Sequence, residues 1–96
     1  MGYENIDSIL DDWAQTNGLH IYKEYQEGEV RSVEQRSGPR SGFQIWIDKP
    51  DSNGLIGIHL WDFKRAGRRR DFLVSLVDLR EYLESALRIA KSWLDP

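Results

Sequence analysis

The sequence contains no cysteine and only two histidines among its 96 residues. The absence of cysteine excludes a disulfide framework and thiolate chemistry. A zinc site would need further ligands of these two types beside His20 and His59, so we expect no bound metal. No glycine-rich loop with the spacing that cradles a phosphate is present, so we expect no cofactor either.

Long apolar runs are also absent. No segment approaches the roughly twenty apolar residues of a membrane span. The N-terminal stretch carries acids where a signal peptide would carry bases, at Glu4, Asp7, Asp11 and Asp12. We therefore expect a cytoplasmic protein without a membrane segment. The formal net charge is −3, and because a general nucleic-acid binder normally has a basic excess, nucleic acid is disfavoured as a partner.

The strongest periodic pattern lies between Leu76 and Leu94. Apolar residues recur there at spacings of three and four, which predicts a long amphipathic helix. Ser75 immediately precedes this run, and Asp78 lies three residues after Ser75. We therefore expect Ser75 to cap the helix through its hydroxyl group. A shorter helical pattern near the start of the chain should end at Asn17–Gly18.

Strand-like alternation fills the region between the two helices. One segment has apolar residues on a single face, at Ile56, Ile58 and Leu60. His59 and Trp61 then share the other face with Phe63, and the alternation of residues 43–48 adds Trp46 to the same face. This second face is not needed for a core, so we look for function there.

The strand after Leu60 returns through a turn at Arg65–Gly67. A three-residue turn would place Asp62 opposite Arg70 and Leu60 opposite Phe72. Because an acid then meets a base and an apolar side chain meets another, this register is self-consistent.

The upstream segments are more polar. Simple alternation places Tyr22 and Tyr25 on opposite faces of one strand, and Glu27–Gly28 resembles a turn. Val30–Arg36 carries several charges, including Arg31, and we expect an edge strand there because charges discourage further pairing.

These elements together predict an α+β fold in a single domain over residues 1–96. The expected order is an N-terminal helix, an antiparallel meander sheet of about five strands and a long C-terminal helix, with both helices on one face of the sheet.

No set of side chains in the sequence points to catalysis. His59 could act as a general base beside Asp71 or Asp62, but no serine nucleophile motif accompanies it, so a surface histidine is the simpler interpretation. Asp11 and Asp12 are neighbours on a helix, where adjacent side chains point in different directions. We therefore expect a protein that is not an enzyme.

A basic cluster occupies the hairpin Lys64–Arg70 and includes Arg68, Arg69 and Arg70. With Trp61 and Phe63 close by, it could grip phosphates while a ring stacks on a base. A solvated turn with internal ion pairs and a contact for an acidic protein are the other interpretations. The alternative function is thus a nucleic-acid-associated module that uses this hairpin.

The aromatic strand face gives the sharper hypothesis. A contiguous aromatic patch on a small domain usually marks a contact surface, and tryptophan and arginine are enriched where binding energy concentrates. We predict a protein-binding site that includes Trp46, His59, Trp61, Phe63, Arg68, Arg69 and Arg70. A homodimer seam and cover by the loop of residues 37–42 are the alternatives for this face.

Three segments carry a family resemblance. Trp13 ends the first helix, the fourth strand reads His59–Asp62, and the leucine-rich last helix closes with Ala90–Leu94. In an acidic helix–meander–helix domain, these segments resemble small immunity proteins of bacterial toxin–immunity systems. The resemblance implies a chain that binds and blocks a cognate toxin and has no catalytic activity of its own.

Overall fold

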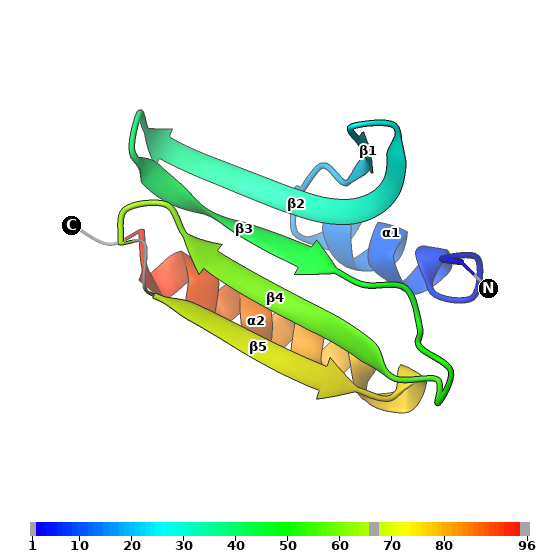
Figure 1. Cartoon of the computed structure of the whole chain (residues 1–96). Helices are drawn as coiled ribbons and strands as arrows, with labels where there is room; N and C mark the ends of the chain where they lie inside the picture. Colours follow the sequence, from blue (N-terminus) through cyan, green and yellow to red (C-terminus); the bar gives the residue numbers. More distant parts are fainter. Residues whose placement is uncertain (1, 66–67, 95–96) are drawn as a thin grey trace.

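The computed structural model describes residues 2–65 and 68–94, which form an antiparallel sheet with helices on one of its faces (Figure 1). The elements are α1 (Asp7–Thr16), β1 (Tyr22–Tyr25), β2 (Gly28–Gly38), β3 (Ser41–Ile47), β4 (Ile56–Asp62), β5 (Arg69–Val74), the short 3₁₀ helix η1 (Leu76–Asp78) and α2 (Leu79–Ser92). Each strand pairs with the next along the chain, in the order β1-β2-β3-β4-β5. The predicted α+β architecture is confirmed. Within the described ranges, no helix is long and apolar enough to cross a membrane.

The core lies between the sheet and the two helices. Ile45, Ile58 and Leu60 project inward from β3 and β4 and are fully buried. They belong to one cluster with Leu83 of α2 and Leu10 of α1. Because burying such a side chain contributes about 1.5–3 kcal/mol, this cluster orients the sheet and leaves its opposite face for other uses.

The end of α1 follows the prediction. Asn17 is the C-cap and Gly18 takes a positive φ of 66°. The N–H of Leu19 bonds to the carbonyl of Ala14 at 2.8 Å, which completes the glycine-dependent helix stop. The side chain of Asn17 also donates to Glu84 on α2 at 3.0 Å, so the two helices are linked at this point.

The start of α2 corrects the predicted cap. The chain first forms η1, and α2 begins only at Leu79. The hydroxyl of Ser75 faces a carboxylate oxygen of Asp78 at 3.3 Å, and Ser75 makes no side-chain cap bond. The prediction that Ser75 caps the long helix is wrong, because the 3₁₀ turn separates its hydroxyl from the first N–H groups of α2.

The register between β4 and β5 differs by two residues from the prediction. Leu60 pairs with Arg70, and the N–H of Asp62 bonds to the carbonyl of Arg68 at 3.1 Å. The connection is therefore longer than three residues, because the Asp62 carboxylate accepts from the backbone N–H of Lys64 at 2.9 Å and holds a wider loop. Ala66 and Gly67 of the predicted turn lie outside the described residues. A shift of two residues keeps each side chain on its face, so the face assignment is unaffected.

The first part of β2 is not an edge, because β1 pairs with it. Arg31, predicted as a charge that protects an edge strand, is only 5% exposed. Its guanidinium donates to both carboxylate oxygens of Asp7, at 2.7 and 3.0 Å, and thereby ties β2 to α1. The predicted loop of residues 37–42 is also different: Gly38 pairs with Ser41, so this segment continues the hairpin at the end of the sheet.

Candidate functional site

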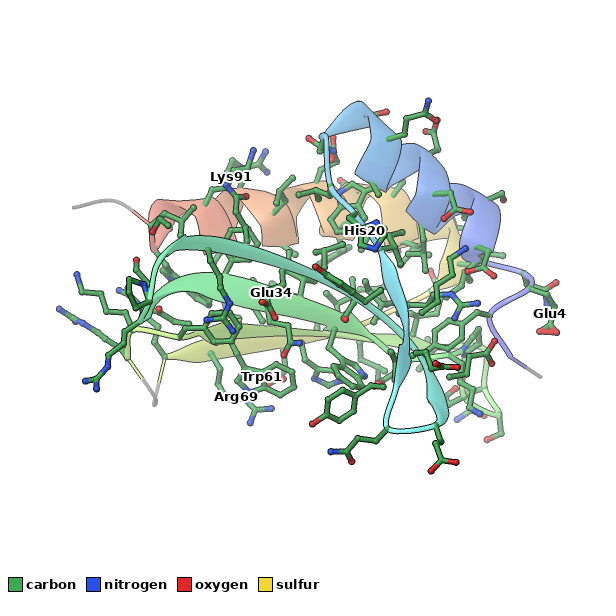
Figure 2. All side chains as sticks on the ribbon, turned by 90° about the horizontal axis from the view of Figure 1, so that it is seen from above. Glu4, His20, Glu34, Trp61, Arg69 and Lys91 are labelled. Carbon is green, nitrogen blue, oxygen red and sulfur yellow. The ribbon has the colours of Figure 1, made fainter. Side chains whose placement is uncertain are left out.

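The sheet surface opposite the helices carries a row of ring side chains, which we call the aromatic face: Tyr25, Trp46, His59 and Trp61. The rings of Tyr25 and Trp46 meet nearly edge to face at 6.1 Å, and those of Trp46 and Trp61 at 6.4 Å. His59 stacks on Trp61 at 6.2 Å. Figure 2 shows Trp61 on the side of the sheet away from Lys91 of α2. Such ring pairs stabilise one another, so the row is a continuous surface.

Strand alternation brings most of this row together, as the sequence predicts. Trp46 lies directly opposite His59 in the β3–β4 ladder, and Trp61 is two positions further along β4. Phe63 follows at the end of the same row, where the guanidinium of Arg36 lies over its ring at 4.5 Å. The predicted aromatic residues therefore share one surface.

Two tyrosines of β1 were not predicted at this surface. The register shifts between Tyr22 and Glu24, so Tyr22 pairs with Ser32 and Tyr25 pairs with Gly28. A bulge of this kind reverses the direction of the following side chains. Both tyrosines therefore border the aromatic face, whereas uninterrupted alternation would separate them.

His59 is held between two carboxylates. Its Nδ1 lies 2.7 Å from Asp71 Oδ1, and its Nε2 lies 2.7 Å from Asp48 Oδ2. Burial alone would lower the pKa of His59, but the hydrogen bonds to Asp71 and Asp48 outweigh it and raise that pKa above its ordinary value. Hydrogen bonds from Arg69 and His59 lower the pKa of Asp71. When the ring is protonated, both of its nitrogens carry a proton that can be donated to these carboxylates.

This arrangement changes the interpretation of His59 as a general base. A general base must present a ring nitrogen to the proton that it removes. Both nitrogens of His59 are engaged by carboxylates of its own chain. The geometry favours a structural use, in which the ring braces Trp61 by stacking.

Gly57 makes room for the histidine and its partner. A Cβ atom at this position would lie 2.5 Å from Asp48 Oδ2 and 2.9 Å from His59 Nε2. Real side chains do not tolerate such distances, so any larger residue would push the carboxylate away from the ring. The sequence alone did not identify this role, because the partner Asp48 lies just after the end of β3, distant in the chain from Gly57.

Two adjoining hollows mark the aromatic face. The first, of about 330 Å³, is lined by Tyr25, Gln44, Trp46 and Trp61. The second, of about 260 Å³, is lined by Tyr22, Glu24, Tyr25, Ser32, Glu34, Gln44 and Trp46. The two hollows share Tyr25, Gln44 and Trp46 in their walls.

The three arginines of the basic hairpin do not share a surface. Arg69 points to the aromatic face, where it lies over Trp61 at 5.3 Å. Arg68 instead bonds to the buried Asp62 at 2.7 Å and lies over Trp93, next to α2, at 5.4 Å. Arg70 pairs with inward-facing Leu60 and so lies on the helix side. The strand alternation that unites the aromatic residues separates these arginines.

Across 2–65 and 68–94, no group of histidine, aspartate and glutamate side chains is placed to hold a metal ion. The chain shows no significant match to a protein-family model, a curated protein or a solved structure. The functional interpretation therefore depends on the geometry of the aromatic face.

Proposed function

We propose that this chain is a protein-binding domain without catalytic activity, and that the aromatic face is its docking surface. The observation that carries this proposal is the edge-to-face row of Tyr25, Trp46 and Trp61 on the side that the helices do not cover. Large aromatic side chains contribute most to affinity when a partner removes them from water. The row offers several such anchors side by side.

The surface is also organised before binding. His59 stacks on Trp61 and is itself held by Asp48 and Asp71. Side chains that are already ordered lose little conformational freedom on association, so less of the interaction energy is offset by ordering. This supports a specific protein contact at the face.

Within this class, we propose an immunity protein that binds and blocks a cognate bacterial toxin. The support is the resemblance of the segments ending at Trp13, Asp62 and Leu94, together with the acidic net charge of −3. Association of two copies through the same face is the competing use, and nucleic-acid binding through Lys64–Arg70 is disfavoured because its arginines diverge.

The test is to co-express this chain with the protein encoded by the neighbouring gene. We expect the wild type to restore growth and to form a complex, and Trp61→Ala or Trp46→Ala to weaken that complex by about thirtyfold, or about 2 kcal/mol. Tyr82→Ala is the matched control, because Tyr82 is an exposed aromatic residue that contacts Phe72 rather than the aromatic face.

The outcomes separate the proposals. Full binding by both tryptophan variants would remove the docking role of the aromatic face. A neighbouring protein that is neither toxic nor bound would remove the immunity function. If the wild type sediments as a dimer and Trp61→Ala sediments as a monomer, the aromatic face serves self-association. If the chain instead binds nucleic acid with an affinity that falls steeply as salt is added, the nucleic-acid alternative is favoured.

A further inference from the structure

The outer edge of β5 is open to another strand. β5 is the last strand of the sheet, and none of the elements labelled in Figure 1 lies beyond it. The N–H of Asp62 bonds to the carbonyl of Arg68, and bonded pairs alternate along an antiparallel ladder, so the even-numbered residues of β5 bond to β4. Arg69, Asp71 and Leu73 therefore turn their backbone N–H and C=O groups outward. Among the residues that the structure describes, none bonds to these outward groups.

The two edges of the sheet differ in their protection. β1, at the far edge, has four exposed residues, a shifted register and the charges of Lys23 and Glu24, and all three features discourage pairing with another chain. β5 pairs with β4 in unbroken register, and its second half, Phe72–Val74, carries no charge and no proline. Leu73 is 64% exposed, and Val77, just beyond the strand, is 93% exposed. An unpaired backbone edge beside exposed apolar side chains fits a further β-strand.

We propose that this edge binds β5 of a second copy of the chain, antiparallel and about a two-fold axis at Leu73. In this register Leu73 meets its own counterpart, and Phe72 meets Val74 of the other copy. Asp71 meets Ser75, which has extended backbone angles, φ −83° and ψ 164°, and so continues the ladder. The axis stands perpendicular to the sheet, so both aromatic faces lie on one side and stay open. The pairing therefore uses a different surface from the docking role.

The sequence of β5 selects this axis among the two-fold registers. An axis at any of the charged residues Arg69–Asp71 would set like charges opposite each other, which destabilises a sheet. An axis at Phe72 would set Leu73 against the carboxylate of Asp71, and an axis at Val74, the last residue of the strand, would leave half of the ladder unformed. The axis at Leu73 sets apolar side chains opposite each other. This self-complementarity points to a second copy rather than to an unrelated strand.

Sedimentation equilibrium from about 5 to 500 µM tests the pairing. We expect the wild type to form a reversible dimer with a Kd of about 10–100 µM, because one short strand pair gives an interface at the small end of the known range. Hydrogen exchange on the same protein gives a second measurement. The amides of Asp71 and Leu73 should exchange more slowly as the protein concentration rises, whereas the amide of Phe72, which faces β4, should change little.

Two charge variants locate the axis. Leu73→Lys and Leu73→Glu each set like charges face to face at the axis, so each should raise the Kd at least about tenfold while circular dichroism shows a retained fold. An equimolar mixture of the two should form a dimer again, because lysine then faces glutamate. Tyr22→Lys is the matched control, because Tyr22 is 49% exposed on the opposite edge strand, and it should dimerise like the wild type.

Three results would overturn the inference: a wild type that is monomeric at about 500 µM, a dimer that both Leu73 variants retain, or a mixture of these variants that stays monomeric. A monomer whose Asp71 and Leu73 amides become protected only when another protein is added would also overturn it, and would assign the edge to a strand of that protein. A dimer that Trp61→Ala loses and Leu73→Lys keeps would assign self-association to the aromatic face instead.

Discussion

Substitution of Asp7 by alanine should strongly destabilise the fold. Arg31 is 5% exposed, and Asp7 neutralises it through bonds of 2.7 and 3.0 Å. Removing one partner of a buried ion pair typically costs about 3–5 kcal/mol, because the other charge stays buried without compensation. Glu29 remains 3.4 Å from Arg31 but is exposed, so we expect about 3 kcal/mol, the lower end of that range. Since a domain of this size is stable by about 5–14 kcal/mol, the loss is a large fraction.

Urea unfolding followed by tryptophan fluorescence measures this loss. With a typical slope of about 1–3 kcal/mol per molar urea, the midpoint should fall by roughly 1–3 M. Asp11→Ala is the control, because Asp11 only pairs with the exposed Lys23, and it should change stability by less than about 0.5 kcal/mol. The double variant Asp7→Ala/Arg31→Met should recover much of the stability, since it removes the buried charge.

Acid provides a second test of the same pair. The hydrogen bond from Arg31 lowers the pKa of Asp7 below its unfolded value. Its stabilising contribution is therefore present above the unfolded pKa and is lost as the pH falls through the folded pKa. The wild type should lose more stability on acidification than Asp7→Ala. A loss of less than about 0.5 kcal/mol in Asp7→Ala at neutral pH, or no recovery in the double variant, would refute the reasoning.

The remaining predictions concern the histidine site, the core and a turn. Because the pKa of His59 is raised, the stabilising contribution of His59 is present below the unfolded pKa and is lost as the pH rises through the folded pKa. Gly57→Ala displaces Asp48 from the ring and should lower the pKa of His59 toward its ordinary value in an NMR titration. An unchanged titration would show that Asp48 does not act on the ring. Leu83→Ala should cost about 2–5 kcal/mol in denaturant unfolding because Leu83 is fully buried, and a negligible cost would contradict its place in the core. Glu27 has a positive φ of 66° in the β1–β2 turn, so Glu27→Gly should stabilise the fold by up to about 1 kcal/mol, whereas destabilisation would mean that the turn is not strained.

Apolar periodicity predicted the parts of the fold that depend on side-chain direction. Leu60 and Trp61 occupy opposite faces as expected, and this held although the partner of Leu60 is Arg70 rather than Phe72. A two-residue shift is invisible to the period-two pattern, which explains why the faces were predictable and the register was not.

Features that depend on distant partners were not predictable in this way. The burial of Arg31 requires Asp7 from α1, and nothing in the local charge pattern of β2 indicates that helix. The bulge in β1 similarly reverses Tyr25 without a proline or glycine to mark it. The two hollows beside Tyr25 and the space that Gly57 leaves for Asp48 and His59 are formed by segments that are distant in the sequence. Only the assembled sheet therefore reveals them.

The order of the strands has a consequence for the folding rate. Because each strand pairs with its neighbour in the chain, the sheet can form by successive closure of short loops, each at a small entropic cost. The α1–α2 contact between Asn17 and Glu84 joins residues 67 positions apart, so it closes a far longer loop than the strand pairs do. We expect this contact to form after the folding transition state. Asn17→Ala should then accelerate unfolding and leave the folding rate nearly unchanged, so the helix pair would govern how long the folded sheet survives rather than how fast it assembles.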